Sequence, residues 1–296
     1  MKKIKDQLSY HLMLTPGMIF LILFSFLPMF GIIMAFQDYT PAKGMLGSHW
    51  VGLQNFKYMI QIPDSMQILI NTLIIAIGKT ILGTIIPIIF ALLLNEIRLK
   101  WAKKTIQTIV YLPHFLSWAV LAAIVINFFD FNGPINQFLG VFGIKPTMFL
   151  VSNNWFRPVL IGTDTWKEFG YGSIVYLAAL TGIDPGLYEA AAIDGANRFK
   201  QLVHVTLPGI MPIIMLMVAL NLGNILNAGF DQVFNLYNPI VYQTGDIIDT
   251  YVYRVGLVGM QYSFATAVGL LKSVVGCILL LSANKLSKKL ANMQIF

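Results

Sequence analysis

Charged side chains are scarce in this chain of 296 residues. Asp, Glu, Lys and Arg together make up 11% of it, whereas soluble domains carry about 25%. Hydrophobic residues make up 57%, and no polar stretch is long enough to form a soluble domain. The composition therefore excludes an ordinary soluble protein and indicates an all-α protein of the membrane.

Cysteine and metal-ligand patterns are also nearly absent. The single cysteine, Cys277, lies in an apolar run, so no disulfide framework exists and a buried, inert side chain is expected. The sequence GKT at 78–80 lacks the glycine that a phosphate-binding loop needs five residues upstream, where Leu73 stands. The four histidines are scattered without metal-ligand spacing: His11, His49, His114 and His204. We therefore expect no metal site, no catalytic residues and no nucleotide bound by this chain.

Long apolar runs recur along the chain. A helix needs about 20 mostly apolar residues to cross a bilayer, and six runs of this kind predict six transmembrane helices, kinked at Pro87 and Pro113. The first run resembles a signal peptide, but it is too long and has no small-residue cleavage site, so an uncleaved span is expected. The predicted spans are 12–36, 68–94, 105–129, 158–180, 210–229 and 262–283.

The connections between these runs predict the orientation. If the N-terminus lies inside, the cytoplasmic segments hold twelve of the 20 basic residues and the outer loops hold five. Positive charge concentrates on the cytoplasmic side of membrane proteins, so both termini are predicted to be cytoplasmic. The expected organisation is a cytoplasmic N-terminus at 1–11, a six-helix transmembrane domain at 12–283 and a cytoplasmic tail at 284–296. The net charge of +7 then reflects topology rather than nucleic-acid binding.

One cytoplasmic loop, 182–209, has an unusual composition. Asp184 and Pro185 predict a helix start, with an acidic N-cap and proline at the first helical position. The EAAA sequence that follows favours helix and has little side-chain bulk. Gly195 permits a bend before a second short helix, which Pro208 is expected to end. Such an element suits insertion into a groove of a partner, and an ordinary amphipathic loop is the alternative.

Ionisable residues interrupt three of the predicted spans. Lys79, Lys167 and Lys272 each lie roughly ten residues, about 15 Å, from the outer end of a span, which predicts a position near mid-depth. Asp164 and Glu168 are four residues apart on one helix face. The carboxylates could pair with two lysines inside the bundle, or the lysines could line a water-filled pathway with surplus positive charge. The second alternative leads to the hypothesis that an acidic cargo passes.

Amide and aromatic side chains complete the candidate pathway. Three asparagines recur every three residues in the fifth span, where they could bind sugar hydroxyls or hydrogen-bond to neighbouring helices. Aromatic residues on the fourth span could stack on sugar rings or pack against other helices. The full candidate pathway is Lys79, Asp164, Trp166, Lys167, Glu168, Tyr171, Asn221, Asn224, Asn227 and Lys272.

The loop at 182–209 resembles the EAA loop of permease subunits of ATP-binding-cassette (ABC) importers. The matching residues are Glu189, Ala190, Ala191, Asp194, Gly195, Ala196, Leu207 and Pro208. Other stretches resemble carbohydrate permeases that handle oligosaccharides and polysaccharide fragments: WVGLQNF (50–56), YLPHFLSW (111–118), NAGFDQVFNLYNP (227–239) and DIIDTYVYR (246–254). The resemblance implies the type I ABC importer permease fold and a coupling helix that docks into a cytoplasmic ATPase.

The resemblance also implies partners. One chain supplies one EAA loop, whereas an ATPase dimer needs two, so a second, related permease subunit is expected. An extracytoplasmic solute-binding protein would deliver the oligosaccharide, and the separate ATPase would bind ATP and Mg²⁺. The implied location is the bacterial cytoplasmic membrane, with several passes through the lipid bilayer. The alternative function is a secondary sugar transporter driven by an ion gradient.

Overall fold

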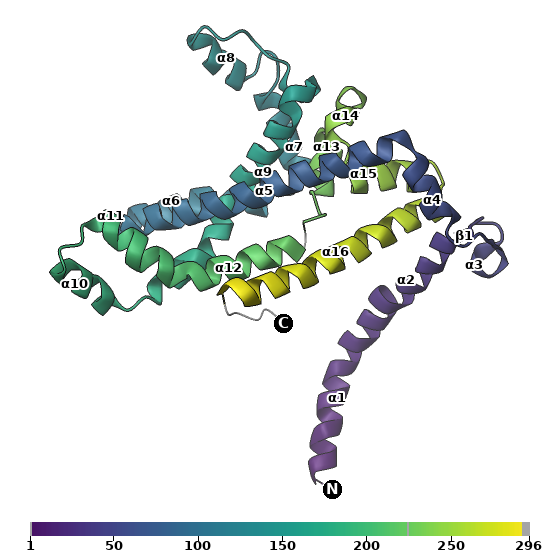
Figure 1. The fold of residues 1–296 in the computed structure, drawn as a ribbon, viewed down its shortest axis with the longest axis horizontal. Coiled ribbons are helices and arrows are strands. Elements are labelled where there is room, and N and C mark those ends of the chain that lie inside the picture. The colour runs from purple at the N-terminus through teal and green to yellow at the C-terminus, as the bar shows by residue number, and fades with distance from the viewer. Residues whose placement is uncertain (1, 224, 292–296) are drawn as a thin grey trace. The chain divides into compact units, whose positions relative to one another are not determined.

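The computed structural model describes residues 2–223 and 225–291, and the chain divides into two compact units. The first unit combines the chain up to Ser65 with Tyr251–Ser273, and the second combines Met66–Thr250 with the chain from Val274 onward. Nearly all regular structure in the described residues is helical (Figure 1). The predicted helical fold is therefore confirmed, with one small addition: the two-residue strands β1 (Gln37–Asp38) and β2 (His49–Trp50) pair in antiparallel fashion.

The first unit begins with a long apolar helical path from Tyr10 to Phe36. Its side chains are almost all exposed, as expected of a helix that faces lipid. A π-helical turn precedes Pro28, and in it the Leu27 amide bonds to the Ile22 carbonyl five residues earlier. The successive parts are α1 (Lys2–Leu21), the π turn Ile22–Phe26, α2 (Leu27–Met29) and the 3-10 helix Phe30–Phe36.

The WVGLQNF stretch holds the C-terminal end of this path in place. Trp50 stacks on Phe36 with ring centroids 5.9 Å apart. The Asn55 side-chain amide donates to the carbonyls of Ala35 (2.9 Å) and Gln37 (3.0 Å), so it holds the end of the helix to the start of β1. The remaining elements of this unit are α3 (Gly44–Gly47), α4 (Gln54–Gln61), the π helix Tyr253–Val258 and the first part of α16 (Tyr262–Ala291).

The second unit is built around two long helices, α5 (Pro63–Glu96) and α9 (Asn153–Thr181). Buried apolar side chains gather at two levels along both helices. One cluster contains Ile75 and Phe156, and the other contains Ala91 and Tyr176. The other helices are α6 (Lys100–Tyr111), α7 (Trp118–Phe128), α8 (Pro134–Val141), α10 (Pro185–Ile193), α11 (Arg198–Gln201), α12 (Leu207–Gly223), α13 (Phe230–Leu236), α14 (Tyr242–Gly245) and α15 (Ile248–Val252).

Four helices in the described part of the chain are long and apolar enough to cross a membrane. They correspond to the first, second, fifth and sixth predicted spans: Tyr10–Phe36, Asp64–Glu96, Arg198–Gly223 and Tyr262–Ser282. The fourth predicted span lies in α9, whose middle carries Asp164, Lys167 and Glu168 and is too charged to qualify by composition. Cys277 is exposed on α16, so its expected burial within the chain is wrong. A membrane helix covers its apolar side chains with lipid, so an apolar run does not require burial in protein.

The third predicted span, 105–129, is not one continuous helix. Its two halves, Lys100–Phe115 and Trp118–Phe128, are bent by 106°. Pro113 has no amide hydrogen, the helix tightens to a 3-10 turn there, and the extended residues Leu116 and Ser117 separate it from α7. The expected kink at Pro113 is confirmed as a complete break.

The fifth predicted span, 210–229, is wrong at both ends. The helix already starts at Arg198 and passes Pro208 without stopping, because the Leu207 amide bonds to the Leu202 carbonyl in a π turn. A π turn of the same kind precedes Pro28, and in both places the residue before the proline is leucine. At its other end the helix stops at Gly223, and the chain then turns into a left-handed backbone at Gly229, with φ of +90°.

Candidate functional site

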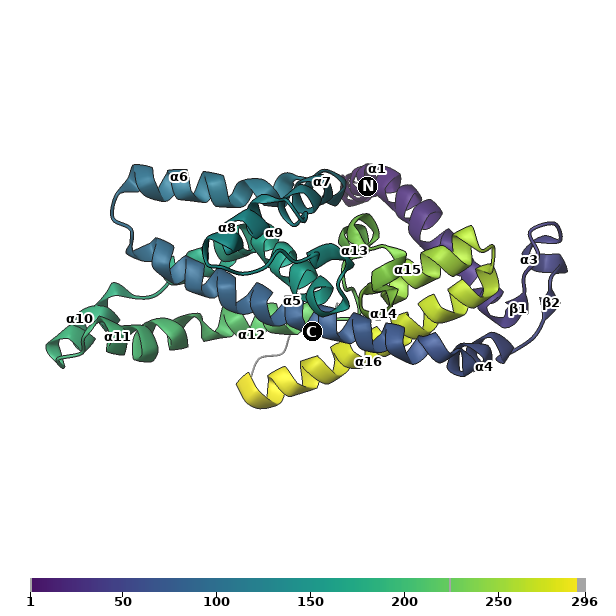
Figure 2. The same cartoon turned by 90° about the horizontal axis from the view of Figure 1, so that it is seen from above.

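Helix α10 contains the EAA sequence and has a built start. The Asp184 carboxylate accepts from the Gly186 amide at 2.9 Å, as an N-cap does, and Pro185 occupies the first helical position. Both features are as predicted. Figure 2 shows α10 and α11 together at one end of the second unit, away from α13 and α14.

The DGA sequence closes the other end of α10. Gly195 has a φ of +78°, which favours glycine. The Ala196 amide bonds to the Ala191 carbonyl at 2.9 Å, and the Gly195 amide bonds to the Ala192 carbonyl at 3.1 Å. These two bonds form a Schellman motif, which satisfies the last carbonyls of a helix. The predicted bend at Gly195 is confirmed, and the backbone bonds explain why glycine stands there.

Side chains then bind α10 to the helix that follows. Tyr188 Oη lies 3.0 Å from Thr206 Oγ1, and the Asn197 side chain caps α11 through the Lys200 amide. Apolar groups nevertheless remain uncovered: Ile193 is 87% exposed and Phe199 is 72% exposed. Of the predicted coupling residues, Glu189, Ala190, Asp194, Gly195 and Pro208 are exposed, and Ala191, Ala196 and Leu207 are half-buried. The loop is complete in its own hydrogen bonding but presents an uncovered surface.

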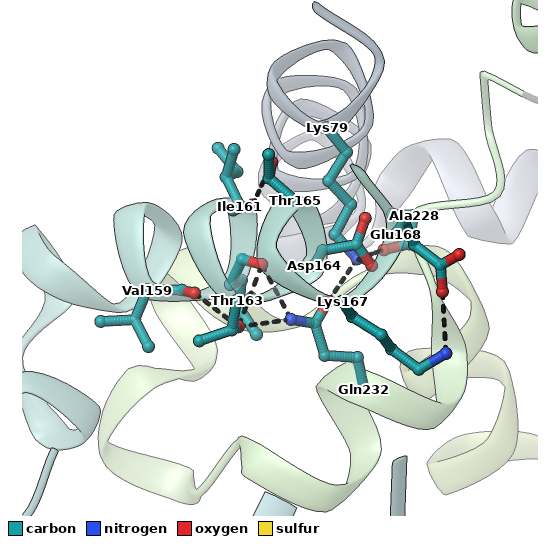
Figure 3. A network of polar contacts seen from close by, with 11 residues as sticks. Lys79, Val159, Ile161, Thr163, Asp164, Thr165, Lys167, Glu168, Ala228 and Gln232 are labelled. Carbon is teal, nitrogen blue, oxygen red and sulfur yellow. Dashed lines mark hydrogen bonds and ion pairs between the residues drawn. The ribbon is translucent and has the colours of Figure 1, made fainter. Parts of the chain in front are cut away.

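A second group of functional candidates lies between the two apolar clusters (Figure 3). Lys79 of α5 is 10% exposed, and its ammonium group lies 3.1 Å from the Asp164 carboxylate of α9. The same group donates to the Ala228 carbonyl at 2.7 Å and to the Gln232 side-chain oxygen. Three acceptors from two chain segments therefore surround one buried cation, as a charge removed from water requires.

Gln232 connects this cation to a second part of α9. Its side chain is fully buried, and its amide nitrogen donates to Thr163 Oγ1 and to the Leu160 carbonyl, each at 2.8 Å (Figure 3). One amide therefore bonds to groups of both long helices and holds α13 against them. We call Lys79, Asp164, Thr163, Gln232 and the Ala228 carbonyl the polar layer.

A separate group of ionisable side chains lies at the break between α6 and α7. Lys167 lies 2.8 Å from the Glu168 carboxylate and donates to the His114 carbonyl at 2.9 Å. The other carboxylate oxygen of Glu168 lies 2.7 Å from His114 Nδ1. The His114 ring stacks on Tyr171 with centroids 3.8 Å apart and planes within 2° of parallel. Glu168 and Tyr171 both keep exposed surface, so this group can contact a solute.

The structure describes four of the five remaining pathway candidates. Trp166 is 43% exposed and lines an apolar cavity of 440 Å³ that includes Trp155 and Phe129. Asn221 is half-buried on α12, and Asn224 lies outside the described residues. Asn227 is exposed beyond the end of α12, so the prediction of three asparagines along one helix is wrong. Lys272 is half-buried on α16 in the other unit.

Internal pairing is the alternative that the structure favours for two of the three lysines, since Lys79 and Lys167 each have a carboxylate within 3.1 Å. The sequence reasoning missed the partners that complete these groups. His114 has no metal-ligand spacing that would mark it as functional. Gln232 stands between Asp231 and Val233, and nothing in that sequence indicates that it will be buried. The sequence also does not indicate that Arg157 donates to Asn71 Oδ1 (2.6 Å) and to the Thr244 carbonyl (3.0 Å).

Breaking the polar layer on one side is expected to destabilise the protein. Lys79→Met removes the cation and leaves the Asp164 carboxylate unpaired, a change that costs about 3–5 kcal/mol in buried pairs. The double variant Lys79→Met/Asp164→Asn is expected to recover much of the loss. Thermal unfolding of the protein in detergent measures both. If the double variant is no more stable than the summed effects of Lys79→Met and Asp164→Asn predict, the two side chains are not coupled in this way.

Gly229 provides a second test of the layer. A Cβ there would lie 2.7 Å from the Lys79 ammonium nitrogen and would also have a φ of +90°. Gly143 has a φ of +75° but open space around its Cβ position, so it is a matched control for backbone strain alone. Gly229→Ala is expected to lower the unfolding midpoint more than Gly143→Ala, whose strain costs roughly 1–2 kcal/mol. Equal effects would mean that the Lys79 contact contributes nothing.

Comparisons with known proteins agree over the length of the chain. The polygalacturonan/rhamnogalacturonan transport system permease protein YteP of Bacillus subtilis (strain 168) is 42% identical over 295 residues, covering 99% of this chain and 92% of that protein. Protein LplB of the same strain is also 42% identical, covering 98% and 91%. Both similarities extend over the loop at 182–209 and the polar layer.

A crystal structure of a bacterial ABC transporter involved in the import of the acidic polysaccharide alginate is similar with a TM-score of 0.90. It is 39% identical, and the match covers 98% of each chain. The protein is thus a helical membrane protein with the type I ABC permease fold, a transport component rather than an enzyme. The model of one family matches residues 83–292, and the chain belongs to that family, the binding-protein-dependent transport system inner membrane components.

Proposed function

We propose that this chain is one permease subunit of an ATP-driven importer that carries acidic, uronate-containing oligosaccharides across the bacterial cytoplasmic membrane. It forms half of the translocation pathway together with a second, related permease. A cytoplasmic ATPase dimer binds ATP and Mg²⁺, and an extracytoplasmic solute-binding protein delivers the cargo. A second crystal structure with a TM-score of 0.90 supports the last partner, since it contains the alginate transporter with an alginate pentasaccharide-bound periplasmic protein.

The topology that we propose has six spans with both termini in the cytoplasm. Four are the long apolar helices, the fifth is the bent pair α6–α7, and the sixth is α9. The ionisable side chains of α9 that the structure describes as paired support its place in the membrane, because pairing lowers the cost of burying charge. The basic residues concentrated in the cytoplasmic segments support the orientation.

The observation that carries the coupling role is the uncovered surface of α10. A short helix with both ends capped is rigid, and its apolar residue Ile193 faces outward beside small side chains. A cytoplasmic loop of this kind is expected to have a protein partner, and small side chains allow a backbone to approach closely. Glu189 adds an exposed carboxylate that suits a cationic group on the ATPase.

The mechanism is alternating access. ATP binding closes the ATPase dimer and brings the two coupling helices together, and hydrolysis returns them. Helix α10 is joined to α9 by three residues, and α11 continues into α12, so a displacement of the loop is transmitted along two helices. Each state is favoured by what is bound to it, since the ATPase and the cargo bind the two states with different free energies.

The named substrates of the relatives support an acidic cargo. Polygalacturonan and alginate both appear in their descriptions, and alginate is described there as an acidic polysaccharide. Lys79 and Lys167 do not add support for an acidic cargo, because each lysine is paired with a carboxylate and leaves no surplus positive charge. Near the break between α6 and α7, the stacked rings of His114 and Tyr171 instead offer an aromatic surface beside the half-exposed Glu168 carboxylate, which can contact sugar rings but does not attract an acidic cargo.

Coupling is tested at Gly195. Gly195→Val places a β-branched side chain at a φ of +78°, which opens the Schellman motif, whereas Gly195→Asn puts a side chain of similar size there that tolerates this backbone. We expect the valine variant to reach the membrane but to lose most of its ATPase on purification, with uptake reduced at least tenfold. The asparagine variant is expected to keep more of both. Normal uptake by the valine variant at native expression would contradict the docking role.

Cargo and energy source are tested together in proteoliposomes that contain the full transporter. Uptake of oligogalacturonates is expected to require ATP, to survive an ionophore, and to resist competition by neutral oligosaccharides of equal length. Neutral sugars that compete equally would contradict the acidic preference. Uptake driven by an ion gradient without ATP would instead support a secondary transporter.

A further inference from the structure

Helix α13 buries a polar side chain, Gln232, and exposes an aromatic one, Phe234, which is the reverse of what hydrophobicity suggests. Its buried face contains Gln232, Val233 and Leu236, with Gln232 and Val233 fully buried. The bonds of Gln232 to Lys79 and to α9 hold this face against the two long helices. The two phenylalanines of the same helix, Phe230 and Phe234, are less buried and lie towards its exposed side.

Four aromatic side chains follow one another from this exposed side, and one of them, Tyr237, also packs against the apolar cluster that contains Ile75 and Phe156. Phe230, Phe234 and Tyr237 recur at the spacing that places residues on one helix face, and Tyr242 continues the row in α14. Successive ring centroids lie 5.2, 6.2 and 5.1 Å apart, with planes 19°, 39° and 34° from parallel. Phe234 is 38% exposed and the other three are half-buried, so the row keeps an accessible side. We call these four residues the aromatic row.

Polar side chains share the face with the aromatic row. Asp231 and Asn235 are exposed beside Phe234, and Asn238 is half-buried beside Tyr237. Exposing a carboxylate and an amide to hydrocarbon is costly, so this face of α13 does not suit a lipid boundary. Asn235, Tyr237 and Asn238 also line a cavity of 440 Å³ together with Asp130 and Phe131. The face is therefore a mixed aromatic and polar surface next to a cavity.

The aromatic row leads towards the polar layer. At one end, Phe230 follows directly after Gly229 and the Ala228 carbonyl that accepts from Lys79. At the other end, the residue after Tyr242 bonds to the Asn71 side chain of α5. Lys79 and Asn71 are eight residues apart on one helix, a distance of about 12 Å along its axis. Figures 1 and 2 show α13 beside α7, with α14 following it.

We propose that the aromatic row is a track on which the pyranose rings of the cargo stack as the oligosaccharide passes from the outer end of the protein towards the polar layer. Carbohydrate rings present C–H groups on their faces and hydroxyls at their edges. Aromatic faces carry partial negative charge that attracts C–H groups, and the exposed amide of Asn235 can bond to hydroxyls. The proposal rests on the proposed function, because it needs an oligosaccharide cargo.

Two carboxylates limit how tightly such a track can bind. Asp130 and Asp231 flank the aromatic row, and each repels the carboxylate of a uronate. Ring stacking and amide hydrogen bonds are then the attractive contacts. A conducting pathway needs contacts that are favourable enough for entry and weak enough for release, and this combination of groups meets that condition.

The test removes one aromatic ring and keeps the apolar volume. Phe234→Leu is expected to raise KM roughly three- to tenfold for uptake of oligogalacturonates of four or five sugars, and to have a smaller effect on disaccharides, which reach fewer rings. Phe234→Trp, which keeps an aromatic face, is expected to stay close to the original protein. Uptake by proteoliposomes that contain the full transporter measures all three, with protein levels matched. Phe20→Leu in α1, an exposed aromatic residue outside the aromatic row, is the control.

Tyr237→Leu against Tyr237→Phe is an independent pair, so a folding defect at Phe234 does not remove the test. If both leucine variants show the original KM at every chain length, the aromatic row is a packing surface and the proposal is wrong. Failure of the acidic preference is a different result. Neutral oligosaccharides would then be carried, and because stacking uses ring faces, the leucine variants would still raise their KM with chain length if the track exists.

Discussion

The ammonium group of Lys79 lies between two apolar clusters, and much of the second unit is arranged to accommodate it. Water is the ordinary partner of such a charge, and here Asp164, the Ala228 carbonyl and Gln232 take its place. Asp164 is 85 residues from Lys79 in the sequence, and Ala228 and Gln232 are each about 150 residues from it. Because each must reach the same nitrogen, the charge determines how α13 sits against α5 and α9. Phe234 of the aromatic row then lies on the exposed side of α13.

The loop at 182–209 is held mainly by local bonds. Its N-cap at Asp184 and its Schellman motif at Gly195 satisfy the backbone at the two ends of α10, and Arg198 adds an ion pair with Glu96 of α5. What it lacks is cover for Ile193 and Phe199. A rigid shape with uncovered apolar groups is what a docking element requires, because little ordering entropy is then lost on binding. Helix α9, which carries the Asp164 carboxylate, leads directly into the loop.

Where sequence reasoning succeeded, the signal was local. Asp184, Pro185 and Gly195 have the predicted backbone roles because capping and left-handed turns depend on neighbours a few residues away. It failed where a proline or an apolar run allowed two outcomes. Pro208 was expected to end a helix, but a π turn carries the chain past it, whereas Pro113 produces a break of 106°. The choice depends on the hydrogen bonds of the residues before each proline, which composition does not reveal.

Hydrophobicity, charge distribution and capping residues are properties of short segments, and they were enough to predict a helical membrane protein with a capped, bent loop at 182–209. Which side chains meet between α5 and α9 depended on how the helices pack. Gln232 is buried and Asn227 is exposed, although both are amides in the same stretch of chain. The physical reason is that the buried charge of Lys79 selects its partners by position in space, and residues far apart in sequence reach that position only after the helices have packed.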